Sequence, residues 1–300
     1  MFYDAHNHLQ DAWLAPHRAQ VLADLERLPL GRAVVNGTAE ADWSEVASLA
    51  RQHAFVLPSY GLHPWNVGNA GPGWRDALRA RLDASTSLAG IGEIGLDRWM
   101  LDRARPDDSR LTGLRRATMD EQLDAFAWQL ALAAGRNLPV SIHCLDAWGA
   151  LAHALRETAR PARGFLLHAF AGSAETAREL AALGGYFSFN GYFLGERHSA
   201  KRAVFAQLPL DRVLAETDAP AMPLPPALSA YSLPGLADGN PINHPANIGA
   251  VYAGLANVLL SYLFVRYANL GLAGIVYGTI TVVVARCVFW MPWYIRRALN

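Results

Sequence analysis

The sequence predicts an α/β protein whose chain forms a (β/α)8 barrel. Eight short apolar runs rich in β-branched and aromatic residues recur along it, and segments with helical character lie between most of them. The chain of 300 residues is long enough for such a barrel, which takes about 250 residues. A doubly wound open sheet is the competing architecture, but no Gly-x-Gly-x-x-Gly motif follows the first apolar run to favour it.

The eight apolar runs are expected to be the strands of the barrel. They cover residues 2–8, 32–37, 54–62, 88–95, 138–143, 164–168, 186–190 and 212–217. Helices are expected at residues 39–53, 118–135, 147–159, 173–183 and 201–207, and a long loop at residues 220–243, which are rich in Pro, Gly and Ser. Gly135, Gly184 and Gly185 follow helical segments, where a left-handed residue commonly ends a helix.

The charge and the cysteine content of the chain limit which partners and which cellular compartment we expect for this protein. The 26 basic and 26 acidic residues give a net charge of zero, so no global basic field attracts a nucleic acid. A polyanionic substrate would therefore be held by local groups and bound cations. Cys144 and Cys287 lie far apart and suggest no disulfide framework. With no recognisable signal peptide at the start, these features favour a reducing, cytoplasmic location.

The first candidate site is the pair His6 and His8 in the opening segment Phe-Tyr-Asp-Ala-His-Asn-His, residues 2–8. Residues two apart on a strand point to the same face, so both imidazoles would lie side by side. Imidazole is the commonest metal-binding side chain, and two of them make half a site. Taken alone, the pair is better explained as two ordinary surface histidines at a fraying terminus.

Further candidate ligands stand at the ends of other predicted strands. They are Glu93 and Asp97 on the fourth, His143 on the fifth, His168 on the sixth, and Glu216 and Asp218 on the eighth. Each has a structural explanation by itself, but catalytic groups of such barrels sit at these strand ends, and five of the eight ends carry one. Imidazoles with carboxylates suit one or two divalent cations, and a bridging carboxylate such as Glu93 would allow two cations about 3.5–4 Å apart.

The motifs that contain these residues resemble the TatD family of metal-dependent hydrolases, often called TatD-type deoxyribonucleases, within the amidohydrolase-like barrels. The matching stretches are Asp-Ala-His-Asn-His (4–8), Gly-Leu-His-Pro (61–64), Ile-Gly-Glu-Ile-Gly-Leu-Asp (91–97), Pro-Val-Ser-Ile-His (139–143), Leu-His-Ala-Phe-Ala-Gly-Ser (167–173) and Glu-Thr-Asp-Ala-Pro (216–220). Asn-His-Pro (243–245) resembles the family's Asn-x-Pro after the last strand. The resemblance covers about residues 1–256 and implies a TIM-barrel hydrolase.

Carried over position by position, the resemblance implies six metal ligands: His6, His8, Glu93, His143, His168 and Asp218. It implies hydrolysis of phosphodiester bonds, with nucleotides removed from DNA ends, by a metal-activated water whose proton Asp218 accepts while Glu93 holds the metal. His63 would face the substrate. The family's usual Mg²⁺ and the preference of four histidines for Zn²⁺ or Mn²⁺ disagree, so Mg²⁺, Mn²⁺ and Zn²⁺ all stay open.

One departure from the family pattern concerns the substrate. Many members carry Ser-Arg after the strand-five histidine, whereas this chain has Cys144 and Leu145 and so lacks that guanidinium. Arg98 is a candidate substitute for binding phosphate, with a solvated surface role as the alternative. Trp65 and Trp99 are candidates for stacking on bases, with packing as the alternative. The expected partner is DNA or a small phosphodiester.

Residues 257–300 form an atypical apolar tail that departs from the family pattern. They contain no Asp, Glu or Lys, and the charge-free run 267–285 has about the length needed to cross a bilayer. Gly274 and Gly278 have the spacing of closely packed membrane helices, and Trp290, Trp293, Tyr294, Arg296 and Arg297 are typical of an interfacial belt with a positive flank. The tail is similar, over a short stretch, to membrane transporters of the flippase type.

Three interpretations of the tail stay open: a membrane anchor, a fusion onto a truncated hydrolase, and a buried replacement for the closing helix. We therefore expect a hydrolase barrel at residues 1–256 and a separate tail at 257–300. Two other functions also stay open. One is C–N bond hydrolysis of the amidohydrolase type, although that class commonly places a carbamylated lysine where Glu93 stands. The other is a membrane-tethered protein that binds metal without catalysis. No feature of the sequence specifies an oligomeric state.

Overall fold

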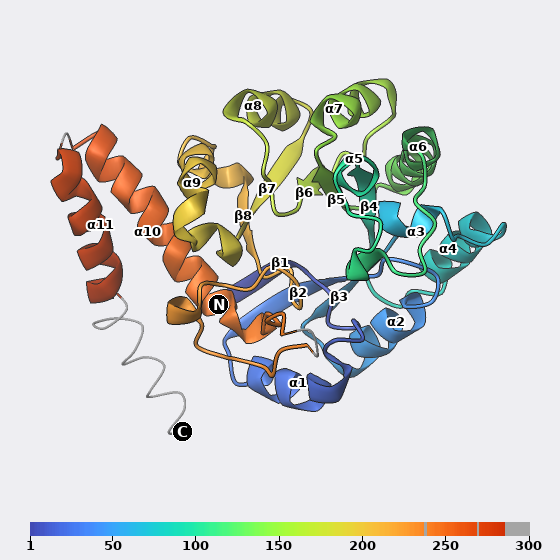
Figure 1. Ribbon diagram of the computed structural model, residues 1–300, viewed down its shortest axis with the longest axis horizontal. Helices are drawn as coiled ribbons and strands as arrows, with labels where there is room; N and C mark the ends of the chain where they lie inside the picture. The colour runs from blue at the N-terminus through green and yellow to red at the C-terminus, as the bar shows by residue number, and fades with distance from the viewer. Residues whose placement is uncertain (237–238, 269, 286–300) are drawn as a thin grey trace.

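The computed structural model describes residues 1–236, 239–268 and 270–285. Its eight strands form one sheet in chain order, and each strand pairs in parallel with the next (Figure 1). The strands are β1 (Phe2–Asn7), β2 (Leu30–Asn36), β3 (Val56–Tyr60), β4 (Gly90–Asp97), β5 (Val140–Leu145), β6 (Phe165–Leu167), β7 (Gly185–Asn190) and β8 (Val213–Glu216). Every predicted strand overlaps an observed one, and the predicted (β/α)8 barrel is confirmed.

The sheet curls until its first and last strands meet. The backbone N–H of Asp218 donates to the carbonyl of His6 at 2.9 Å, and the N–H of His8 donates to the carbonyl of Ala219 at 2.7 Å. A parallel barrel places all carboxyl ends of its strands at one rim. The junction therefore brings His6, on the first strand, and Asp218, just after the last strand, to the same point of the rim.

Helices form the outer ring around the strands (Figure 1). Five match predicted helices: α2 (Trp43–Gln52), α6 (Met119–Arg136), α7 (Trp148–Glu157), α8 (Ala174–Ala182) and α9 (Ser199–Phe205). Four were not predicted, namely α1 (Arg18–Glu26), α3 (Pro64–Val67), α4 (Trp74–Asp83) and α5 (Trp99–Asp102). The two shortest of these, α3 and α5, have four residues each and lie in the loops after β3 and β4. Helices of one turn carry no periodic pattern by which a sequence could reveal them.

Two of the three glycines that were expected to end helices do not lie at a helix end. Gly135 lies inside α6, which instead ends at Asn137 with a left-handed φ of 49°. Gly185 is the first residue of β7, whereas Gly184 has a positive φ of 101° after α8 and fits the prediction. Asparagine tolerates the left-handed conformation better than most residues, which explains how it replaces glycine after α6.

The last two helices, α10 (Ile248–Arg266) and α11 (Gly271–Ala285), pack against each other at the edge of the barrel (Figure 1). The first half of α10 buries Ile248, Val251 and Leu255, and the hydroxyl of Tyr252 donates to the carbonyl of Tyr3 at 3.1 Å. This half closes the barrel beside β1 and β8. α10 therefore runs without a break across the expected boundary between residues 256 and 257.

Within the described residues, the charge-free run 267–285 is not a single helix over its whole length. The part of it that lies in α11, Gly271–Ala285, has 15 residues and a length of about 22 Å, whereas a bilayer core is about 30 Å thick. Among the described residues, one helical stretch, Pro245–Arg266, is long and apolar enough to cross a membrane. One such stretch is weak evidence, and its first half packs on the barrel, so membrane association is not supported.

Gly274 and Gly278 provide the close helix packing that their spacing suggested, but within this chain. A Cβ on Gly278 would lie 2.5 Å from the hydroxyl oxygen of Ser261 on α10, and one on Gly274 would lie 2.8 Å from the backbone nitrogen of Val265. The helices thus approach each other through these two positions. The proposed interfacial residues Trp290, Trp293, Tyr294, Arg296 and Arg297 lie outside the described residues.

Candidate metal centre

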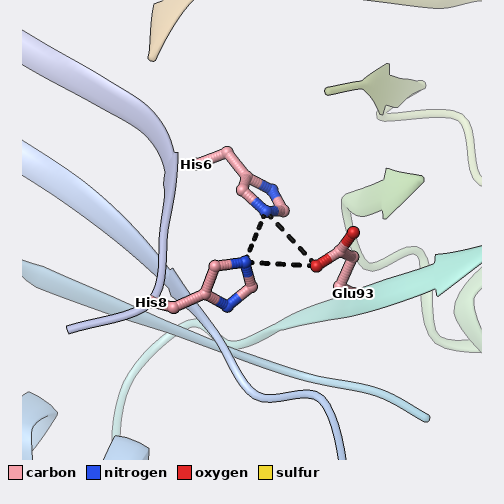
Figure 2. A group of neighbouring side chains, drawn as sticks. All are labelled: His6, His8 and Glu93. Atoms are coloured by element: carbon pink, nitrogen blue, oxygen red, sulfur yellow. Dashed lines mark hydrogen bonds and ion pairs between the residues drawn. The ribbon is translucent and has the colours of Figure 1, made fainter. Parts of the chain in front are cut away.

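His6 and His8 converge on Glu93 at the carboxyl-end rim of the barrel (Figure 2). The Nε2 atoms of the two histidines are 3.1 Å apart, and they lie 3.5 Å and 3.2 Å from Oε2 of Glu93. His6 is on β1 and fully buried, and His8 follows the strand directly. The alternation of a strand therefore does point both rings to one side, as their spacing predicted.

Asp218 completes this half of the centre. Its Oδ1 atom lies 3.6 Å from Nε2 of His6 and 3.4 Å from Nε2 of His8. The residue follows β8 and has a left-handed φ of 51°. The backbone hydrogen bond between Asp218 and His6 that joins β8 to β1 also holds these two side chains together.

The second oxygen of Glu93 faces a different set of histidines. Its Oε1 atom lies 2.8 Å from Nε2 of His168, 3.1 Å from Nδ1 of His143 and 3.4 Å from Nε2 of His63. Glu93 is 3% exposed and comes from β4, so its carboxylate stands between the two groups with one oxygen toward each. All six predicted ligands are therefore brought together. His63, predicted to face the substrate, lies within the cluster itself.

Two carboxylates beside the histidines were candidates at strand ends but were not among the six ligands that the family resemblance implied. Asp97 places Oδ2 3.2 Å from Nε2 of His143, and Glu216 places Oε1 3.7 Å from Nδ1 of His168. Both side chains are fully buried. The sequence showed each at a strand end, but nothing in its pattern told which atom of which histidine each would meet.

The residues proposed for substrate contacts lie farther out. Arg98 is exposed, and its guanidinium reaches Asp102 only at 4.0 Å. The indole N–H of Trp65 donates to Asp97 at 2.6 Å, and the ring lies 6.2 Å from that of Trp99. Both tryptophans are partly exposed and pack around Met100 in a small cluster outside the main core.

Comparison with known proteins gives the family. Residues 3–260 match the family model described as TatD related DNase. The chain belongs to the TatD family. Against the 3′-5′ ssDNA/RNA exonuclease TatD of Cronobacter turicensis it is 32% identical over 207 residues, which are 68% of this chain and 72% of that protein. It is 29% identical to the uncharacterized metal-dependent hydrolase YabD of Bacillus subtilis over 73% of this chain and 80% of that protein.

A solved TatD homologue shares the architecture. The crystal structure of YjjV from Escherichia coli superposes with a TM-score of 0.70 at 27% identity, covering 88% of this chain and 96% of that one. Together with the family match, this makes the chain a metal-dependent hydrolase of the TatD family with a barrel fold. These matches give no support to the transporter likeness suggested for residues 257–300.

The ionisation of the cluster fits a family of metal-dependent enzymes. Burial alone would raise the pKa of Glu93, but His168, His63 and His143 hold that pKa well below its usual range. Burial lowers the pKa of His143, yet its contacts with Asp97 and Glu93 outweigh this and raise the pKa to about 9. The pKa of His8 is raised well above normal because Asp218 and Glu93 outweigh its burial.

The pKa values of the other histidines in the cluster also depend on burial, which lowers them, and on nearby carboxylates, which raise them. The pKa of His168 is raised well above normal because Glu93 and Glu216 outweigh its burial. Burial dominates at His6 and His63, and their pKa values are lowered. The raised pKa values of His8, His143 and His168 favour protonated rings beside the buried carboxylates. A set of five nitrogen ligands and two anionic carboxylates fits divalent cations, which would take the place of those protons.

Proposed function

We propose that this protein is a phosphodiesterase that removes nucleotides from the ends of single-stranded nucleic acid with two bound divalent cations. The observation that carries the proposal is the position of the Glu93 carboxylate, with one oxygen toward His6 and His8 and the other toward His143 and His168. Relatives named as single-strand exonucleases supply the substrate class. A cytoplasmic location stays a prediction.

The ligands divide between two cation sites that share Glu93. His6, His8 and Asp218 would hold one cation with Oε2, and His143 and His168 would hold the other with Oε1, with His63 as an additional donor on that side. Cations bound there would lower the pKa of a coordinated water and offset the charge that develops on a phosphate. The predominance of imidazole favours Zn²⁺ or Mn²⁺ over Mg²⁺.

Asp218 is the proposed acceptor of the proton from the attacking water. Burial would raise its pKa, but the hydrogen bond with His8 and the charges of His168 and His6 lower it, so the carboxylate is ionised at neutral pH. Its Oδ1 atom lies 3.6 Å from Nε2 of His6 and 3.4 Å from Nε2 of His8. An ionised carboxylate at that position can both hold a cation and accept a proton.

Arg98 is the proposed contact for the phosphate backbone. This chain has Leu145 where many TatD proteins carry an arginine, and Leu145 pairs with Asp97 across β4 and β5. Arg98 follows Asp97 directly, and among the described residues the acidic partner of its exposed guanidinium is Asp102, at 4.0 Å. A guanidinium that is free to move can bind a phosphate through two hydrogen bonds.

The test is nucleotide release from single-stranded DNA and RNA labelled at either end, with Mn²⁺, Mg²⁺ or Zn²⁺ and with chelator. Release that needs the cation and disappears in a His6→Ala, His8→Ala double variant supports the proposal. His53→Ala is the matched control, because that histidine contacts Glu26 at 3.4 Å away from the cluster. Absence of release from folded, metal-loaded protein would refute nucleic acid as the substrate, and small phosphodiesters would be assayed next.

A further inference from the structure

Each of the four proposed histidine ligands places its other ring nitrogen within 3.7 Å of an oxygen atom that is not a proposed ligand. On the β1 side these partners are uncharged. Nδ1 of His6 lies 2.7 Å from the hydroxyl of Ser141, and Nδ1 of His8 lies 2.7 Å from the backbone carbonyl of Asn36. Such contacts fix the ring orientation and the tautomer of a metal-binding histidine.

On the other side of Glu93 the partners are carboxylates. Oδ2 of Asp97 lies 3.2 Å from Nε2 of His143, and Oε1 of Glu216 lies 3.7 Å from Nδ1 of His168. That Nδ1 atom is buried and has no hydrogen-bond partner among the described residues. Glu216 is thus the acid toward which an otherwise unsatisfied imidazole nitrogen is directed.

Glu216 is held firmly in this position. Its Oε1 accepts the backbone N–H of Ala169 at 2.8 Å and the amide of Asn190 at 3.3 Å, and its Oε2 accepts the hydroxyl of Ser188. The side chain is fully buried. A buried carboxylate is costly unless it is paired, and these donors together with His168 account for its placement.

Asp97 is fixed in a comparable way. Its Oδ1 accepts the backbone N–H of Met100 at 2.8 Å, and its Oδ2 accepts the indole N–H of Trp65 at 2.6 Å. Both carboxylates therefore have set orientations before any cation arrives. A carboxylate behind a ligand imidazole raises the basicity of the ring, and loss of such a partner costs about 10- to 100-fold in metal affinity.

We propose that Asp97 and Glu216 are positioning residues that make the His143–His168 half of the centre the tighter of two cation sites. The inference rests on the two-cation function proposed above. It predicts that the sites differ because of their outer partners, carboxylates on one side and uncharged oxygens on the other. The weaker site, formed by His6, His8 and Asp218, would then be the one that exchanges its cation.

The test is titration of the full-length, metal-free chain with Mn²⁺, followed by calorimetry and equilibrium dialysis. The unaltered chain is expected to bind two ions in two unequal steps. Glu216→Gln and Asp97→Asn should each weaken the tighter step by roughly 10- to 100-fold and leave the weaker step unchanged. Ser141→Ala is the matched control and should weaken only the weaker step. Glu216→Asp, which keeps the charge, should recover part of the affinity that Glu216→Gln loses.

Several outcomes would overturn the inference. One is that Glu216→Gln lowers the melting temperature of the metal-free chain while the tighter step keeps its affinity, which is the result of a purely structural role. Another is that Ser141→Ala weakens the tighter step. If Glu216→Gln fails to fold, the affinity of the tighter step in Asp97→Asn tests the inference instead, and an unchanged affinity there would overturn it. Failure of the unaltered chain to bind any cation would instead refute the proposed function, so the two failures are distinguishable.

Discussion

At the scale of single residues, protons and cations compete for the same imidazoles. His143 has a pKa of about 9 in the metal-free chain, and the pKa values of His8 and His168 are also raised, because the buried carboxylates favour the charged rings. A ring protonated at its ligand nitrogen cannot bind a cation. Raised pKa values therefore mean that protons must leave when a cation binds at neutral pH.

The expected result is a cation affinity that rises as the pH increases from about 7 to the pKa of His143, about 9. Calorimetry in two buffers of different ionisation enthalpy measures the number of protons released. We expect at least one proton per bound cation at pH 7. An affinity that stays constant over this range, with no proton release, would show that the histidines are already neutral in the metal-free chain.

Glu93 is the residue on which both halves of the centre depend. Glu93→Gln keeps the size of the side chain but removes the charge shared by both sets of histidines. We expect cation affinity at both steps to fall by more than the roughly 10- to 100-fold that loss of a partner behind a ligand costs. Glu196→Gln, on the exposed surface, is the control and should bind as the unaltered chain does. Loss of only one step would argue that Glu93 belongs to a single site.

At the scale of elements, the helix after the β4 loop is started by a capping box. The hydroxyl of Thr118 accepts the N–H of Glu121 at 3.3 Å, and the Glu121 carboxylate accepts the N–H of Thr118 at 2.8 Å. α6 in turn supplies Gln122, whose amide oxygen accepts the N–H of Asp97 at 2.7 Å. The capped helix therefore helps to hold the strand end that carries Asp97.

We expect Thr118→Ala to lower the free energy of unfolding by about 1 kcal/mol, because the first turn of α6 loses an N-cap. The measurement is denaturant unfolding, with Thr112→Ala as the control at an exposed position outside any helix cap of α6. Cation affinity should change little, since the cap acts on the ligands only through α6. Equal stability of the two variants would mean that the cap contributes nothing measurable.

At the scale of the whole molecule, the metal centre is separate from the apolar hairpin, by which we mean the second half of α10 together with α11. Every proposed ligand lies between residues 6 and 218, whereas the second half of α10 and α11 extend away from the barrel (Figure 1). The first half of α10 belongs to the barrel through Val251 and Leu255. The expected division at residue 256 thus falls inside a helix that serves both parts.

Removal of residues 271–300 should therefore leave both cation-binding steps and nucleotide release intact. The deletion spares the buried half of α10, and among the described residues the contact that it uncovers is the one between α10 and α11, so we expect little change in the melting temperature of the barrel. A deletion from residue 248, which also removes the buried Ile248 and Val251, is the contrasting variant and should destabilise the barrel strongly. Loss of cation binding in the shorter deletion would show that the hairpin supports the centre.

Residue periodicity predicted the barrel, and the motifs in their order resembled the TatD family, which implied the six side chains that converge. Parallel strands bring their carboxyl ends to one rim, so residues as distant as His6 and Asp218 are predictable neighbours once the strands are recognised. The short helices α3 and α5, and the asparagine that ends α6 in place of Gly135, escaped because a single turn or a tolerant residue leaves no periodic signal.

Only the tertiary structure decided which groups face which atoms. The direction of each side chain depends on local backbone geometry and packing, which a strand assignment does not specify. For this reason the sequence did not predict that His63 lies within the cluster, or that Asp97 and Glu216 contact His143 and His168. It also did not predict that the two oxygens of Glu93 face different histidines. The same holds for the charge-free tail, because its composition does not reveal that α11 packs on α10 at Gly274 and Gly278.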